Sequence, residues 1–242
     1  MSNETSQPLP GSSIERVRRY ADGAELIFAN AEALYNEAQI LGQARSFARA
    51  ATLHQISMEE CSKIDTLGAA ATSILMGHDV DEERLATAFR DHKSKNFANA
   101  YNAIATEEER AARERGDWVA SSAAFRKFQK QFHLEVNTIK NAGLYVDFKD
   151  GQFTAPKDAI DETTAVVLMH MNADFLRRSD NFVRLLRRMA SDPSSYAELV
   201  KCFSERAEGK RADSDFDPEQ ATTQLMEEMY ADYASKIGQS PK

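Results

Sequence analysis

The chain has 242 residues, 42% of them apolar and 28% charged, a balance typical of globular proteins that excludes wholesale disorder. Its formal net charge of −8 excludes a protein that coats nucleic acid by bulk attraction, although a local basic site is compatible with it. Two cysteines, Cys61 and Cys202, without a CxxC pair exclude a disulfide framework and a zinc knuckle, and they suit a reducing cytosol.

The chain has no stretch that resembles a membrane span or a secretion signal. Its longest apolar run, Ala165–Met169, has about five residues, whereas a transmembrane helix needs roughly 20. The first residues, MSNETSQPLPGSS, are polar and lack an apolar signal core. We therefore expect a soluble cytoplasmic protein without membrane association, with a disordered tail over residues 1–12.

The long stretch between Pro10 and Pro156 contains no proline, so about 145 residues run without a helix breaker. Alanine, glutamate, arginine and leucine are frequent there, and all four are strong helix formers. Start and stop signals divide the stretch into four expected helices, over residues 12–42, 44–76, 79–116 and 117–143. Helices of this length are expected to pack lengthwise as an antiparallel bundle.

Capping patterns support three of these helix starts. Ser12 with a glutamate three residues later, and Asp79 with Glu82, are capping-box signatures, and Asp117 is a suitable N-cap. Apolar residues recur at helical spacing within the helices. The stripes of the first and fourth helices are Ile27, Ala31, Leu34, Ala38 and Leu41, and Phe125, Phe128, Phe132 and Val136.

The pattern changes after residue 143. The segment GLYVDFKDGQFTAP alternates apolar and polar residues around Asp150-Gly151, a hairpin-turn dipeptide, and indicates a loop or a short ribbon. A fifth helix is expected over residues 162–190, a short one to about residue 207, and a last one over 217–237. The predicted class is all-α. Its expected parts are a tail (1–12), a helical bundle (13–147), a connecting loop or ribbon (148–160), helices packing on the bundle (161–207), and a linker with a C-terminal helix (208–242).

Several familiar catalytic motifs are missing from the sequence. GxGxxG, GxxxxGK[ST] and GxSxG do not occur, which argues against nucleotide-binding loops and the hydrolase elbow. No glutamate has a histidine three residues later, as a di-iron bundle requires. We expect no metal and no cofactor.

Two histidines are candidates for acid–base chemistry. His92 lies in FRDHKSK, and its neighbouring cations, Lys95 among them, would lower its pKa and leave a neutral imidazole. His133 lies seven residues after Arg126, so their side chains share a helix face, with Lys130 between them. An arginine that stabilises a phosphorane and a histidine that moves a proton could cleave RNA. A solvated basic face beside the phenylalanine stripe is an alternative that the sequence leaves open.

Two other features have structural interpretations that compete with functional ones. Arg177, Arg184 and Arg188 lie within about 40° of one another around the fifth helix. They could follow phosphates, dock an acidic partner or simply be solvated. His54 shares a helical face with apolar residues, which favours a buried, hydrogen-bonded structural histidine.

The ordered motifs resemble a known family. The spacing of Ala31, Leu34, Ala38 and Leu41, followed by GQARSFARAATLHQISMEECSK, resembles the HEPN superfamily, whose second helix often carries EExxK, here Glu59, Glu60 and Lys63. FRDHKSK, with His92 and Lys95, and KNAGLYVDF, with Lys140, Tyr145 and Asp147, look like the AbiV family of abortive infection proteins. The resemblance covers about residues 24–147.

This resemblance implies a HEPN-like bundle that acts in bacterial antiphage defence. Many HEPN proteins are metal-independent ribonucleases with an Arg-x4–6-His motif, often shared across a homodimer. Arg126 and His133 match that spacing with six residues between them, although Lys127 follows the arginine where the motif usually has another polar residue. Under the hypothesis that this resemblance implies, the catalytic residues are Arg126, His133 and His92. The RNA-binding residues are Lys95, Lys130, Lys140, Tyr145, Arg177, Arg184 and Arg188. The motif-structural residues are Glu59, Glu60, Lys63 and Asp147.

Two functions therefore follow as hypotheses. One is an effector that arrests host translation by cleaving or binding RNA, as a homodimer triggered by a phage-encoded activator. The other is a non-enzymatic module that binds a phage protein or a ribosome-associated partner. The first predicts that basic and imidazole groups of the third and fourth helices, with the segment after them, form one anion-binding pocket.

Overall fold

The computed structural model describes residues 9–91, 95–96, 99–100 and 105–211, and this part of the chain is helical apart from one two-stranded ribbon. The elements are α1 (Gly11–Gln43), α2 (Phe47–Leu75), α3 (Glu82–Arg90), α5 (Glu107–Glu114), α6 (Trp118–Leu144), β1 (Asp147–Lys149), β2 (Gln152–Thr154), α7 (Pro156–Ala159), α8 (Glu162–Ser191) and α9 (Pro193–Arg211). The expected all-α class is confirmed.

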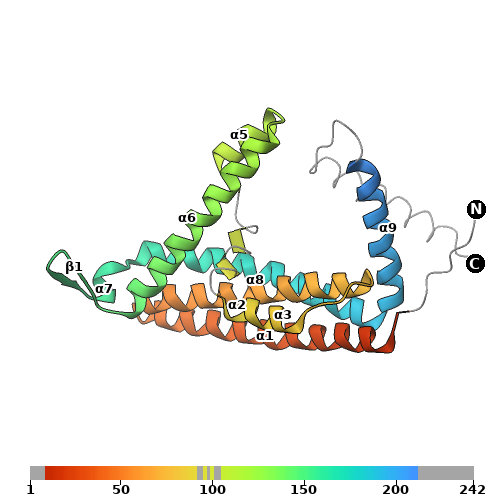
Figure 1. Cartoon of the computed structure of the whole chain (residues 1–242). Helices are drawn as coiled ribbons and strands as arrows, with labels where there is room; N and C mark the ends of the chain where they lie inside the picture. The colour runs from red at the N-terminus through yellow and green to blue at the C-terminus, as the bar shows by residue number, and fades with distance from the viewer. Residues whose placement is uncertain (1–8, 92–94, 97–98, 101–104, 212–242) are drawn as a thin grey trace, which may run out of the picture.

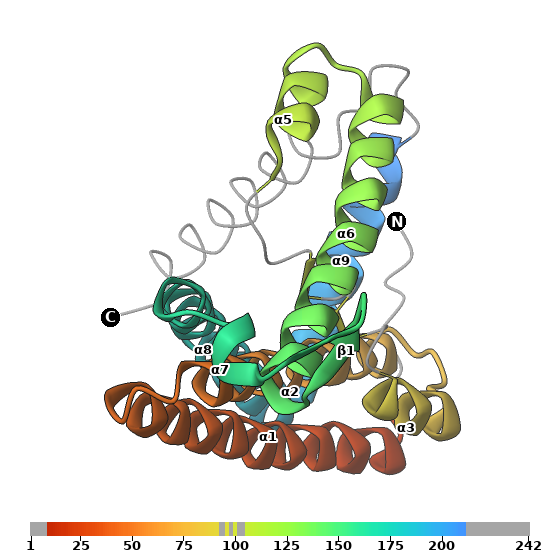
Figure 2. The same cartoon turned by 90° about the vertical axis from the view of Figure 1, so that its left-hand side faces the viewer.

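The body of the molecule consists of α1, α2 and α8, which lie lengthwise side by side, with α1 antiparallel to the other two (Figure 1). α6 contacts α2 near its own C-terminal end and then rises away from the body, with α5 packed against its far end (Figures 1 and 2). None of the described helices combines the length and the apolar character that a membrane crossing requires.

Small side chains allow α1 and α2 to approach closely. Ala24, Ala31 and Ala38 on α1 and Ala51 on α2 are completely buried. Bulkier residues of α2 and α8 fill the remaining space between the helices, among them Ile64, Leu67, Phe175, Leu186 and Met189. α8 contributes to both large core clusters, so it is an integral part of the three-helix body.

The expected third helix over residues 79–116 is wrong. α3 ends at Arg90, Asp91 has an extended backbone, Lys95, Asn96, Asn99 and Ala100 are again helical, and α5 begins at Glu107 after the extended Thr106. Between them Lys95, Asn96, Asn99 and Ala100 are buried against other elements. Helix propensity is worth only tenths of a kcal/mol per residue, so the tertiary contacts of this buried segment interrupt the single continuous helix that propensity favours.

Two of the three expected N-caps are also wrong. α1 begins at Gly11 after Pro10, with no side-chain cap, and α3 is capped by Asp81, which accepts hydrogen bonds from the backbone of Glu83 and Arg84. The cap by Asp117 is confirmed, because its carboxylate accepts a hydrogen bond of 2.9 Å from Ala120 N–H.

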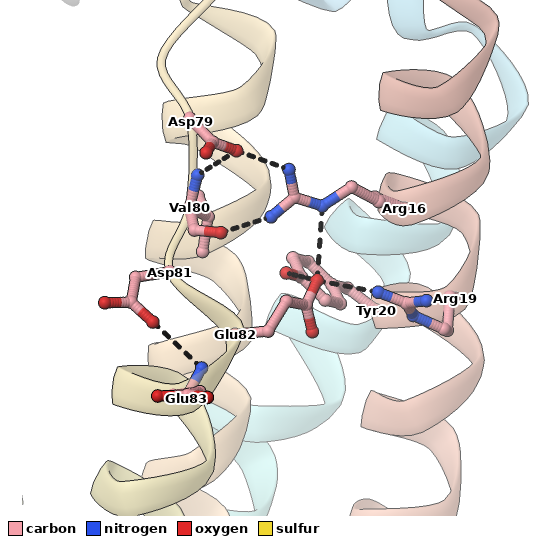
Figure 3. Close-up of polar contacts among 8 residues, drawn as sticks. All are labelled: Arg16, Arg19, Tyr20, Asp79, Val80, Asp81, Glu82 and Glu83. Carbon is pink, nitrogen blue, oxygen red and sulfur yellow. Dashed lines mark hydrogen bonds and ion pairs between the residues drawn. The ribbon is translucent and has the colours of Figure 1, made fainter.

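Asp79 and Glu82 instead join α3 to α1 through a polar network (Figure 3). Arg16 donates to Asp79 at 2.8 Å and to Glu82 at 3.2 Å, and Tyr20 donates to the same Glu82 oxygen at 2.9 Å. The Arg16 guanidinium holds the pKa of Asp79 below its usual range. The pKa of Glu82 is also low, because its hydrogen bond from Tyr20 and nearby arginine charges outweigh the opposing effect of desolvation.

A ribbon follows α6, as the sequence pattern predicted. β1 and β2 are antiparallel, and Asp150 and Gly151 form the turn with φ of 52° and 78°. These positive φ values match a two-residue hairpin turn, which favours Asp-Gly. Phe148 and Phe153 pair across the strands and are 60% and 78% exposed.

The C-terminal part follows the prediction as far as it is described. α8 matches the fifth expected helix closely, and α9 continues to Arg211, into residues that the sequence assigned to a linker. The last expected helix, over residues 217–237, lies outside the described residues, as do residues 1–8 of the tail. The proposed division into parts stays a prediction.

His54 is a buried structural histidine, as its helical position predicted. It is 2% exposed on α2, and its Nδ1 lies 3.2 Å from the amide nitrogen of Asn172 on α8. The Asn172 amide oxygen accepts a hydrogen bond of 3.0 Å from Ser57, and the Tyr35 ring meets the imidazole edge-on. Burial lowers the pKa of His54 to about 4, so the ring is neutral at physiological pH.

This burial predicts acid-sensitive stability. Between pH 6.5 and 4 the unfolded chain protonates His54 and the folded chain does not, so the free energy of unfolding falls as the pH is lowered. The loss from this residue is at most about 3 kcal/mol. Urea unfolding at pH 7.0 and 4.5 measures it. His54→Gln should reduce the pH dependence, whereas His170→Gln, at an exposed position, should leave it intact. Equal pH dependence in all three proteins would contradict the assignment.

Candidate functional site

The core of the candidate site is a buried carboxylate held by two lysines. Glu59 on α2 is 2% exposed, and its two oxygens lie 2.8 Å from Lys140 Nζ and 3.4 Å from Lys95 Nζ. Lys140 comes from α6 and Lys95 from the segment between α3 and α5. Removing three charges from water is unfavourable unless they are paired, so this cluster ties three distant segments to one point.

The two adjacent glutamates of the EExxK motif have different roles because neighbouring helix residues point about 100° apart. Glu59 faces α6, whereas Glu60 accepts a hydrogen bond of 3.1 Å from Asn30 on α1 and pairs with Lys63. The motif therefore joins α2 to α6 through one carboxylate and to α1 through the other.

A close helix crossing places Lys140 at Glu59. Gly143, one turn after Lys140, is buried on α6 against α2. A Cβ atom at Gly143 would lie 2.2 Å from Thr52 Oγ1 and 2.6 Å from the Ala48 carbonyl oxygen. Only glycine allows the two backbones to come this close, and the contact fixes which turn of α6 reaches Glu59.

Two asparagines extend the polar cluster. Asn99 donates a hydrogen bond of 3.0 Å to the Met58 carbonyl, and the Asn96 amide nitrogen lies 3.2 Å from Nδ1 of His133 on α6. When that amide donates, the proton of a neutral His133 ring is on Nε2. Asn96 thus orients the half-buried imidazole from a different segment of the chain.

One face of α6 carries a row of basic groups that passes from exposed to buried. Arg126, Lys130, His133 and Lys140 lie within about 80° of one another around the helix. Arg126 and Lys130 are exposed, His133 and Lys140 are partly buried, and Lys140 reaches Glu59. No carboxylate among the described residues pairs with Arg126 or Lys130, whereas Lys127 forms an ion pair of 3.0 Å with Glu108 on α5. We call Arg126, Lys130 and His133 the α6 basic row.

The other predicted residues that the structure describes lie outside this row. Tyr145 is 65% exposed after the end of α6, and Asp147 is exposed in β1. The three predicted arginines of α8 are exposed; Arg177 pairs with Asp174 and Arg184 with Asp180, both on their own helix. Arg188 is also on α8, and His92 lies outside the described residues.

Among the described residues, two groups of the predicted site can be distinguished, an internal Glu59 cluster and the α6 basic row, and the single pocket stays a prediction. Sequence reasoning missed Asn96, Asn99 and Gln55, although two asparagines three residues apart in KNFANA hinted at a polar helical face. Gln55, one turn before Glu59, is 1% exposed, and neither its amide oxygen nor its nitrogen bonds to a described residue. Across the described ranges no group of three or more His, Cys, Asp or Glu side chains is placed to hold a metal ion.

Comparison with known proteins identifies a family. The family model described as AbiV, of the HEPN type, matches residues 19–177, about two thirds of the chain. A protein of Sinorhizobium fredii, described as uncharacterized protein y4gJ, is 35% identical over 109 residues. The match covers 45% of this chain and 57% of that relative. No solved structure matches the chain. The matched family range contains the α6 basic row and all three residues of the Glu59 cluster.

Proposed function

The chain belongs to the AbiV family of HEPN proteins and has a role in abortive-infection defence, and from this premise we propose that it binds RNA along α6 and cleaves it, so that translation in the infected cell stops. The observation that carries the proposal is the α6 basic row. Arg126 and Lys130 are exposed cations without a carboxylate partner among the described residues, and they share a face with His133.

The chemistry follows from these groups. RNA can be cleaved when its 2′-oxygen attacks the adjacent phosphorus and the bond from phosphorus to the 5′-oxygen breaks. One imidazole accepts the 2′-hydroxyl proton, a second group protonates the leaving oxygen, and a cation stabilises the charge on the phosphorane. One copy of the row provides a single His133. We therefore propose a homodimer in which a second row supplies the second proton-transfer group.

The Glu59 cluster has a positioning role in this proposal. Lys95 and Lys140 neutralise Glu59, so we do not assign them to RNA. Instead, the cluster anchors the segment that carries Asn96, and Asn96 orients His133. Because α6 rises from the body (Figure 2), its N-terminal part, to which Arg126 and Lys130 belong, extends beyond the three-helix core.

Matched variants test the proposal on purified full-length protein with a labelled single-stranded RNA. Lys130→Ala should weaken RNA binding by about tenfold and reduce its salt dependence by about one counterion. Lys127→Ala is the control, because that neighbouring cation is already engaged by Glu108. His133→Ala should retain binding but lower the cleavage rate by about 10²–10⁴-fold. Equal loss in the two lysine variants, or unchanged cleavage by His133→Ala, would rule the mechanism out.

A non-enzymatic protein-binding role is the second candidate, and exposed apolar side chains favour it. Val119 and Leu134 on α6 are 81% and 64% exposed, and Phe148 and Phe153 lie on the outer ribbon. Large apolar groups in water are characteristic of protein contacts when they cluster. In this case a Phe148→Ser/Phe153→Ser variant should lose protection in a phage plaque assay, while His133→Ala should protect fully.

A further inference from the structure

A cavity of about 230 Å³ lies where the turn between α1 and α2 meets α7. Its walls come from three segments: the turn, the first residues of α2, and the stretch from α7 to the start of α8. The lining includes Arg45, Ser46, Phe47, Arg49, Lys157 and Ile160. The cavity is separate from the α6 basic row. The part of α6 next to the start of α2 is Gly143, and Arg126 lies roughly 25 Å from Gly143 along the helix axis.

Three cations converge on this cavity without a carboxylate to balance them. Arg45, Arg49 and Lys157 are exposed, and none forms an ion pair with any residue that the structure describes. Most of the cations discussed above behave differently, since Lys127, Arg177 and Arg184 each have a carboxylate partner. In a chain of net charge −8, three unbalanced positive charges around one hollow create a local site for an anion.

Backbone groups at the start of α2 reinforce that preference. Ser46 precedes the helix but its side chain makes no capping hydrogen bond. The N–H groups of the first turn of α2, from Phe47 to Arg49, therefore have no acceptor within the described chain, and their residues line the cavity. A helix of 29 residues adds partial positive charge at this end.

The cavity also has an apolar wall. Ile160 is 7% exposed, and Phe47 is partly buried, with the Arg45 guanidinium 5.8 Å from its ring centroid. This stacking holds one cation beside an aromatic surface. Arginine and lysine side chains with backbone N–H groups are the usual ligands of phosphate, and an aromatic ring suits an organic substituent. We propose that the cavity binds a small organic phosphate, with its phosphate on Arg45, Arg49 and Lys157 and its organic part against Phe47.

The backbone conformation at Arg45 allows a substitution that removes the cation without destabilising the fold. Its φ of 58° is in the left-handed region, where glycine has no steric penalty and arginine does. Arg45→Gly therefore removes a cation while relieving backbone strain. The variant should unfold at the same temperature as the wild type or higher, so a loss of binding cannot be attributed to misfolding.

Titration calorimetry on the full chain with adenosine 5′-monophosphate, inorganic phosphate and adenosine tests the assignment. The nucleotide should bind more tightly than inorganic phosphate, and adenosine should give no measurable heat. Arg45→Gly, Arg49→Gln and Lys157→Gln should each weaken nucleotide binding by about tenfold. Lys149→Gln is the matched control, because Lys149 is an exposed cation of the nearby ribbon that does not line the cavity.

Each contrary result has a defined meaning. No heat with the nucleotide, or adenosine binding as tightly as the nucleotide, would overturn the phosphate site. Inorganic phosphate binding as tightly as the nucleotide would overturn the role of Phe47. Equal weakening by Lys149→Gln would show attraction by overall charge and no site. RNA cleavage by the same preparations is a separate readout, so failure here leaves the α6 mechanism unaffected.

Discussion

Glu59→Gln is expected to lower the free energy of unfolding by about 3–5 kcal/mol, the largest loss that we predict for any single polar group. The variant keeps the shape of the side chain but removes its charge, so the ammonium groups of Lys95 and Lys140 lose the carboxylate that neutralises them. Those lysine side chains are only 9% and 13% exposed, so water cannot replace the carboxylate. Urea unfolding at pH 7 measures the change through the transition midpoint.

Glu108→Gln is the control for this experiment. Glu108 also pairs with a lysine, Lys127, but the two side chains are 64% and 71% exposed. Exposed pairs contribute about 0–1 kcal/mol, so this variant should remain close to the wild type. Similar midpoints for Glu59→Gln and Glu108→Gln would show that the Glu59 cluster is not a buried ionic centre.

A triple replacement separates the burial of charge from packing. Glu59→Leu with Lys95→Met and Lys140→Met removes all three charges and keeps similar volumes. Because an apolar replacement of a buried ionic cluster is often neutral or stabilising, this variant should recover most of the stability that Glu59→Gln loses. If the triple variant is as unstable as Glu59→Gln, the polar contacts themselves, and not the uncompensated charges, determine the loss.

The long helices were predictable because their periodicity repeats over many turns. α1, α2, α6 and α8 each present apolar residues at three- and four-residue spacing, and local errors at an end do not change that signal. The interruption after α3 was not predictable in the same way. The chain leaves the helix at Asp91 and again at Ala105 and Thr106, none of which is glycine or proline, and between these breaks the helical Lys95, Asn96 and Asn99 have partners on α2 and α6.

The candidate site shows the same limit of sequence reasoning. Helical phase correctly placed Arg126, Lys130 and His133 on one face, since they belong to one helix. It could not show that Lys95 and Lys140 meet at Glu59, because contacts between helices depend on how the helices cross. The resemblance brought these residues into one motif set, but their expected role was RNA binding, and the structure pairs both with a carboxylate.

Gly143→Ala is expected to destabilise the protein by at least about 1–3 kcal/mol, the usual range for overpacking, and to change the crossing of α6 and α2. The sequence predicted the end of this helix at about residue 143, next to the end of α6 at Leu144, but it did not show that α2 occupies the space of the missing Gly143 side chain. The added methyl group would meet the Ala48 carbonyl oxygen at 2.6 Å, a backbone atom that cannot rotate away. α6 must then move outward, which also separates Lys140 from Glu59.

Gly68→Ala is the matched control, because it is the same substitution inside α2 at a position with open space around the new methyl group. Alanine is favoured over glycine within a helix, so this variant should gain roughly 0.5–1 kcal/mol. The two variants therefore have opposite expected signs in thermal or urea unfolding. A Gly143→Ala protein as stable as Gly68→Ala would mean that α6 does not cross α2 at this glycine. Contacts other than this crossing would then have to fix the position of His133 relative to the Glu59 cluster.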